Sequence, residues 1–271
     1  MNPYRLITHD PANGIWNMAV DEAVLESVSR GDSKPTLRLY AWQPGCLSLG
    51  YSQTYKDVDL ERLKSSGGGL VRRLTGGKAI MHIDELTYSV IAPIQDALMT
   101  GTLLESYNRI ARGLLQALRI LGLPAEINAL IPGTNTTSAG PVCFEVPSAY
   151  EITVNGKKLI GSAQARRKLG VLQHGSLPLF GDLTRITNML KFDSGKERQQ
   201  AATRLLDRAA TVESILGVKI TWETAARAFT EGFKIALDLE LEENDLSDGE
   251  RERAKELINT RYAQSSWTER I

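Results

Sequence analysis

The spacing of apolar side chains along the chain predicts helices near its start, at its middle and throughout its last third. Residues 17–30 (NMAVDEAVLESVSR) have the helical period, with Asn17 as the expected N-cap and Gly31 as the stop. Residues 103–121 repeat apolar side chains every three or four positions and form the clearest helix. Further helices are predicted over residues 183–192, 197–207, 212–216, 222–239 and 248–262.

Strands are predicted between the first helices, where apolar and polar residues alternate. Residues 36–42 (TLRLYAW) have the alternation of a half-buried strand, and residues 46–51 (CLSLGY) follow as a second one. Residues 170–181 (GVLQHGSLPLFG) predict another strand, which contains His174. Strands mixed with helices, followed by helices alone, are typical of an α+β domain that ends in a helical region.

Composition and charge exclude several classes of partner and location. The 271 residues include 32 basic and 32 acidic side chains, so no net charge attracts the protein to nucleic acid or to a membrane surface. No apolar stretch approaches the roughly 18 residues of a membrane span, and the first residues lack the pattern of a secretory signal. We therefore expect a cytoplasmic protein.

The chain has two cysteines, and their surroundings differ. Cys46 lies among apolar residues of a predicted strand, which favours packing. Cys143 follows residues 131–142 (IPGTNTTSAGPV), which have the composition of a loop. A reducing compartment disfavours a disulfide between the two, and a zinc site lacks further ligands. Cys143 is therefore either a packing residue or a reactive thiol.

A predicted hairpin gives Cys143 a neighbour that favours reactivity. Asn155-Gly156 is the residue pair that a type I′ turn requires, and the returning strand begins Lys157-Lys158. Because side chains alternate along a strand, Lys157 and Lys158 face opposite sides. An ammonium group beside a thiol favours the thiolate and lowers its pKa, which suits covalent acyl transfer.

A second informative stretch, residues 70–93, follows a short helix predicted over residues 58–64 with Asp57 as its cap. Strand-forming residues dominate both ends of the stretch, and Gly76-Gly77 interrupts them. Glycines allow a ligand to approach main-chain N–H groups closely, but a β-bulge or a turn explains them equally well.

Four motifs in order resemble a known superfamily. These are RRLTGGKAIMH with ELTYSV, VCFEVPSAYEI, GKKLIGSAQARR and LQHGSL. Together they resemble the lipoate-protein ligase, lipoyl/octanoyl transferase and biotin ligase superfamily, over about residues 17–192. The nearest resemblance is to cysteine-dependent octanoyltransferases. It implies the catalytic-domain fold of biotin and lipoate ligases, a mixed and mostly antiparallel sheet flanked by helices, over residues 1–240, with a C-terminal helical extension over residues 241–271.

The resemblance also implies roles for individual residues. Cys143 would be the acyl-thioester nucleophile, and Lys158 the lysine that lowers its pKa and contacts the acyl carbonyl. Arg72 and Arg73 alternate along a strand, so we expect one to serve the pocket and the other the surface. The pocket would be lined by Arg72, Arg73, Gly76, Gly77, His82, Gly161, Ser162 and Ala163. His82 and His174 also fit structural roles, which are the usual ones for histidines in strands.

The implied reaction moves an octanoyl group from octanoyl-acyl carrier protein to a lysine of a lipoyl-domain acceptor, the H protein of the glycine cleavage system. It needs no metal and no nucleotide, so no cofactor is expected, and the expected state is a monomer. Three alternatives stay open. They are an ATP-dependent lipoate-protein ligase that would need Lys158 but not Cys143, an amidotransferase acting between lipoyl domains, and a non-catalytic binding homologue.

Overall fold

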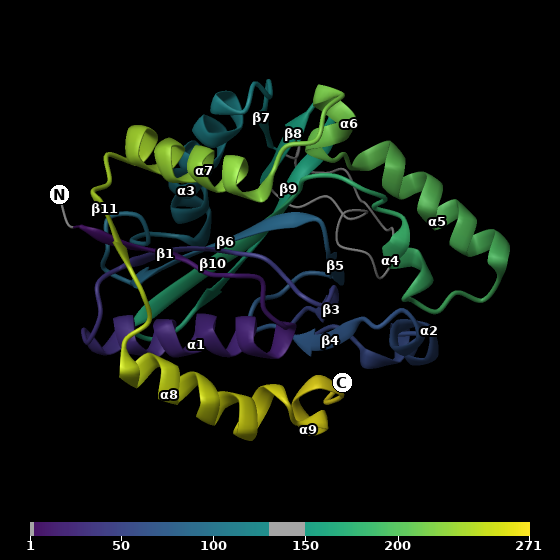
Figure 1. The fold of residues 1–271 in the computed structure, drawn as a ribbon, viewed down its shortest axis with the longest axis horizontal. Coiled ribbons are helices and arrows are strands. Elements are labelled where there is room, and N and C mark those ends of the chain that lie inside the picture. Colours follow the sequence, from purple (N-terminus) through teal and green to yellow (C-terminus); the bar gives the residue numbers. More distant parts are fainter. Residues whose placement is uncertain (1–2, 130–149) are drawn as a thin grey trace.

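An eight-stranded mixed sheet forms the centre of the computed structural model, which describes residues 3–129 and 150–271 (Figure 1). Cys143 and the loop predicted before it lie outside the described residues. The strands are β1 (Tyr4–Thr8), β2 (Thr36–Tyr40), β6 (Glu85–Pro93), β7 (Glu126–Ala129), β8 (Tyr150–Val154), β9 (Lys157–Arg166), β10 (Gly170–Pro178) and β11 (Leu241–Asn244). Their order across the sheet is β11-β1-β2-β6-β10-β9-β8-β7.

Most neighbouring strands of this sheet run antiparallel, which confirms the predicted arrangement. β1 pairs in parallel with β11 and with β2, whereas the pairings from β2 through β6, β10, β9 and β8 to β7 are antiparallel. A second sheet of three strands has β3 (Cys46–Leu49) at its centre, β4 (Gly69–Arg72) parallel to it and β5 (Ile80–His82) antiparallel.

Helices cover both faces of the large sheet (Figure 1). On one face α3 (Leu103–Ile120) and α7 (Trp222–Leu237) pack on each other, and on the other face α1 (Gly14–Arg30) is backed by α8 (Asp248–Leu257). The remaining helical elements are a 3₁₀ turn (Tyr55–Asp57), α2 (Leu60–Ser65), α4 (Arg185–Asn188), α5 (Gly195–Arg208), α6 (Val212–Leu216), a π-helical turn (Ile258–Tyr262) and α9 (Ser265–Thr268). Within the described ranges, no helix combines the length and the apolar character that crossing a bilayer demands.

Two helix caps and the burial of one strand differ from the prediction. The side chain of Asn13, not Asn17, caps α1 by accepting from the Trp16 amide, while Asn17 is buried and donates to the carbonyls of Ala12 and Ala41. Asp59, not Asp57, caps α2. β2 is buried on both faces rather than one, because the two layers of helices enclose it.

The last third of the chain contains a strand that the sequence did not predict. Residues Leu241–Asn244 pair in parallel with β1 and extend the sheet by one edge strand. Three of its four residues are exposed, so it lacks the apolar alternation by which strands are predicted. The predicted helix over residues 183–192 shortens to α4.

The predicted hairpin is confirmed. Asn155 and Gly156 have φ angles of 50° and 75°, the left-handed pair of a type I′ turn. Lys157 is exposed, whereas Lys158 is only 4% exposed. The alternation along β9 therefore sends one lysine outward and the other into the protein.

Candidate active site

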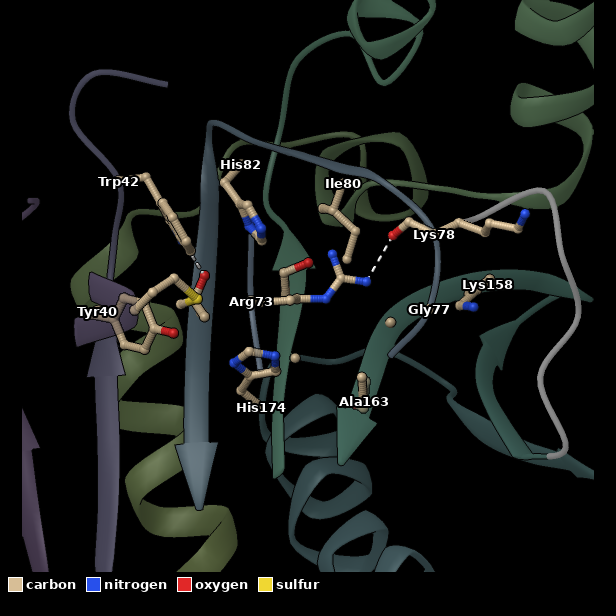
Figure 2. Close-up of a pocket in the computed structure, with 16 residues that line it drawn as sticks. Tyr40, Trp42, Arg73, Gly77, Lys78, Ile80, His82, Lys158, Ala163 and His174 are labelled. Atoms are coloured by element: carbon tan, nitrogen blue, oxygen red, sulfur yellow. Dashed lines mark hydrogen bonds between the residues drawn. The ribbon is translucent and has the colours of Figure 1, made fainter. Parts of the chain in front are cut away.

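A cavity of about 140 Å³ lies between the large sheet and the small one (Figure 2). Figure 2 shows Lys78, Gly77 and Lys158 at one end of it and Tyr40 and Trp42 at the other. Of the predicted site residues, these lie in the wall: Arg73, Gly77, His82, Lys158, Gly161, Ser162 and Ala163. His174, for which a structural role was expected, also lies in the wall. Further wall residues, which the sequence did not single out, include Met18, Tyr40, Trp42, Ile80, Thr87 and Ser176.

Sheet register aligns four residues of the cavity wall. Tyr40 of β2 faces Thr87 of β6, Thr87 faces Ser176 of β10, and Ser176 faces Gly161 of β9. These four wall residues form a row across the strands, and three inter-strand steps of about 4.8 Å give it a length of about 14 Å. Gly161 and Ala163 on β9 are small, which leaves room beside the row.

Lys158, at one end of the cavity, has a carboxylate partner (Figure 2). Its ammonium group donates to Glu151 Oε1 at 2.8 Å across the hairpin. The Lys158 side chain is 4% exposed and that of Glu151 is 15% exposed, so the pair is largely shielded from water. Such shielding strengthens the influence of Lys158 on any group that enters the cavity.

Arg73 orders the glycine segment, by which we mean residues 75–78 around Gly76-Gly77. Its guanidinium donates to the carbonyls of Gly76 and Lys78, each at 2.8 Å, and to the carbonyl and hydroxyl of Ser48. Gly77 has φ of 94°, which favours glycine, and a Cβ on Gly50 would overlap the Gly77 carbonyl oxygen. Gly76 contributes its carbonyl to Arg73 and is not among the described wall residues.

Arg72 does not line the cavity, and the prediction that one arginine of the pair faces the surface was wrong. Its side chain is fully buried and donates to carbonyl oxygens of two segments. One is the C-terminal segment, at Trp267 and Thr268, and the other is the loop at Gly50 and Gln53. Arg72 therefore fixes the end of the chain behind the glycine segment.

His82 lies in a buried chain of hydrogen bonds beside the cavity. Its Nδ1 and the Oε1 atom of Glu85 are 2.7 Å apart, and its Nε2 is 2.7 Å from the Ser48 hydroxyl. Its ring stacks on Trp42 with centroids 4.0 Å apart. Both ring nitrogens are thus engaged by protein groups, which favours the structural role for His82.

His174 connects helix α1 to the glycine segment. Its Nε2 is 2.6 Å from the Thr75 hydroxyl, and its Nδ1 is 3.3 Å from Asp21 Oδ2. Burial lowers the pKa of His174 and outweighs the opposing effect of Asp21. A neutral ring can accept from Thr75 and donate to Asp21, so His174 positions Thr75 next to Gly76.

Cys46 is a packing residue, as predicted. Its side chain is 1% exposed, and burial raises the pKa of the thiol to about 12. It therefore stays protonated at neutral pH and lacks the nucleophilic form. Among the residues that the structure describes, no group of three or more His, Cys, Asp or Glu side chains is placed to hold a metal ion.

Comparisons with known proteins agree with this geometry. Residues 13–234 match the family model of the lipoyl protein ligase A/B catalytic domain. The octanoyltransferase LipM of Moorella thermoacetica is 41% identical over 272 residues, which cover 98% of both chains. That of Kyrpidia tusciae is 40% identical over the whole of both chains, and that of Brevibacillus brevis is 39% identical over 98% of this chain and 99% of its own.

Solved structures of ligases have the same fold. A bi-partite lipoate protein ligase from Thermoplasma acidophilum superposes with a TM-score of 0.83 at 27% identity, over 99% of this chain and 97% of its own. A lipoate-protein ligase A bound with ATP gives a TM-score of 0.80, also at 27% identity, over 98% of both chains.

Proposed function

The chain belongs to the lipoyl protein ligase A/B catalytic domain family and is an octanoyltransferase, and we propose that it carries the octanoyl group as a thioester on Cys143. The family and the α+β fold predicted from the sequence are thus confirmed. The roles of the site residues are part of the proposal, and the observation that carries it is the apolar cavity that ends at Lys158.

The cavity suits a medium-length acyl chain. Its volume of about 140 Å³ is close to that of an engineered cavity of about 150 Å³ that binds benzene, so several methylene groups fit. Burying six methylenes at about 0.8 kcal/mol each contributes roughly 5 kcal/mol to binding. An acetyl group would lose nearly all of this free energy, which favours octanoyl as the cargo.

The proposed reaction has two steps. The thiolate of Cys143 attacks the carbonyl carbon of the carrier thioester, and the carbon–sulfur bond to the carrier breaks as the carrier thiol leaves. The amine of an acceptor lysine then loses a proton and attacks the enzyme thioester, which gives a stable amide. Lys158 favours the thiolate, and together with the backbone N–H of Gly77, which lines the cavity, it stabilises the oxyanion of each step.

We propose octanoyl-acyl carrier protein as the donor and the glycine cleavage H protein as the lipoyl-domain acceptor. A nucleophilic thiol must stay reduced, and the cytoplasm keeps thiols reduced, so we place the enzyme there. The proposed active form is a monomer in which residues 1–240 act as the catalytic domain and residues 241–271 as an extension whose first strand, β11, joins the sheet of that domain. Arg72, at the end of β4, ties the last helix of the extension to the catalytic domain by donating to the Thr268 carbonyl.

One observation favours a second candidate, an ATP-dependent lipoate-protein ligase. The fold matches that of lipoate-protein ligase A bound with ATP. In a ligase the acyl group would be activated as an adenylate, Cys143 would be dispensable, and free octanoate or lipoate would replace the carrier thioester as donor.

Requirement for ATP distinguishes the two functions. The enzyme is given octanoyl-acyl carrier protein and a lipoyl-domain acceptor, and octanoylation of the acceptor lysine is followed by mass spectrometry with and without ATP. The transferase predicts full transfer without ATP and none in Cys143→Ser. Transfer only from free octanoate with ATP, retained in Cys143→Ser, would establish the ligase instead.

A further inference from the structure

The hydroxyl of Ser176 lies in the cavity wall without a hydrogen-bond partner among the described residues. Ser176 is 1% exposed, and its Oγ atom is shielded from water. It stands inside the row across the strands, between Gly161 and Thr87. A buried hydroxyl without a partner costs about 1–3 kcal/mol, so its presence in a binding site needs an explanation.

The other neutral polar side chains of the described wall are already engaged. Tyr40 donates to Asp21, Trp42 donates to Thr87, and Ser162 is 2.7 Å from the Tyr88 hydroxyl. Thr87 donates to Glu85, and both ring nitrogens of His82 and of His174 have partners. Within the described wall, Ser176 is therefore the neutral side chain whose hydrogen-bonding capacity is left for a ligand.

The chemistry of the cargo identifies the partner atom. An octanoyl thioester has one strong hydrogen-bond acceptor, its carbonyl oxygen, because sulfur accepts weakly and the alkyl chain does not accept at all. On the basis of the proposed function, we propose that Ser176 is a substrate-binding residue that donates a hydrogen bond to the acyl carbonyl oxygen. The alkyl chain then runs along the row toward Tyr40 and Met18.

This hydrogen bond acts on the step that forms the enzyme thioester. When the Cys143 sulfur bonds to the carbonyl carbon, the carbonyl π pair moves onto oxygen, and the Ser176 hydroxyl donates to that oxyanion. When the oxyanion collapses, the bond to the carrier sulfur breaks and the carrier thiolate leaves and takes up a proton. Ser176 keeps its own proton throughout, so it lowers the barrier without exchanging protons.

Rates of adduct formation on the whole enzyme test the role. Wild type and Ser176→Ala are mixed with hexanoyl-, octanoyl- and decanoyl-acyl carrier protein, and the acyl-enzyme is quantified by intact mass over time. Loss of one oxyanion donor typically slows catalysis about 100-fold to 1,000-fold. Since other donors remain, we expect the rate of adduct formation to fall at least tenfold in Ser176→Ala. The factor should be equal for the three cargoes because all of them have the same thioester carbonyl. Ser176→Thr keeps a hydroxyl and should restore most of the hexanoyl rate.

Thermal unfolding of the free enzymes separates this role from a structural one. Removing a buried hydroxyl without a protein partner should leave the melting temperature of Ser176→Ala unchanged or higher. Equal rates of adduct formation in wild type and Ser176→Ala would overturn the inference but leave the proposed transferase function standing. A loss of rate confined to decanoyl cargo would do the same, because it would place Ser176 beside the far end of the alkyl chain. No adduct in wild type with any cargo would instead refute the proposed function.

Discussion

Lys158 and Glu151 form a shielded ion pair across the two strands of the central hairpin, with 2.8 Å between the ammonium nitrogen and Oε1. The lysine proposed to favour the Cys143 thiolate is therefore accompanied by a carboxylate that opposes it. Because like charges disfavour ionisation, the net effect on the thiol is set by both groups. We propose that Glu151 tunes the ionisation of the proposed nucleophile.

The first prediction concerns the ionisation of Cys143. Lys158→Ala removes a positive charge and should raise the thiol pKa by about one unit or more, whereas Glu151→Gln removes a negative charge and should lower it. The rate of iodoacetamide alkylation of Cys143 against pH reports both shifts. Peptide mapping separates this signal from Cys46, which should react only after unfolding because burial raises its pKa to about 12. Identical profiles in all three proteins would contradict the role of the pair.

The second prediction concerns chain length. Ala163→Leu should fill part of the cavity beside the row and move the preference from octanoyl toward shorter cargo. Each methylene excluded costs about 0.8 kcal/mol, so losing two should reduce the preference for octanoyl over hexanoyl by roughly tenfold. Competition between the two acyl carrier proteins, read by the mass of the acyl-enzyme, measures the change. An unaltered product ratio would show that the cargo does not use the space that Ala163 leaves beside the row.

The third prediction separates the two adjacent arginines. Arg72→Ala leaves the carbonyls of Thr268 and Gly50 without their buried donor and should lower the free energy of unfolding by about 3 kcal/mol or more. Arg73→Ala also removes a buried donor and should lower stability, but because it loosens Gly76-Gly77 beside the cavity it should in addition slow acyl transfer. Denaturant unfolding and adduct kinetics on both variants test the distinction, which fails if Arg72→Ala unfolds like wild type.

The fourth prediction concerns stability in acid. Burial lowers the pKa of His174, so between its folded pKa and about 6.5 the unfolded chain binds the proton and the folded chain does not. The contribution of neutral His174 to the free energy of unfolding is therefore fully present above about pH 6.5. It decreases as the pH falls, by at most about 1.4 kcal/mol per pH unit. His174→Gln should lower stability at pH 7 but weaken its pH dependence. Urea unfolding from pH 7 to pH 5 measures both slopes, and equal slopes would contradict the assignment.

Local patterns predicted much of the site, and contacts between distant segments were missed. The Asn155-Gly156 turn and the opposite orientations of Lys157 and Lys158 depend only on neighbouring residues, so they can be predicted from the sequence. Ser176 shares a strand face with His174, two positions earlier, and that spacing could have indicated it.

Other features could not be predicted because they depend on segments far apart in the chain. Arg72 meets the C-terminal helix across 196 positions, and the strand Leu241–Asn244 forms only because β1 offers a free edge. The charged, exposed sequence of that strand has no strand signal of its own.

The most direct test of the central claim is the intact mass of the enzyme after mixing with octanoyl-acyl carrier protein in the absence of ATP. We expect an added octanoyl group on wild type, carried by the peptide that contains Cys143, and no adduct on Cys143→Ser. An octanoyl adduct that persists in Cys143→Ser, or transfer to the acceptor by that variant at the wild-type rate, would contradict it.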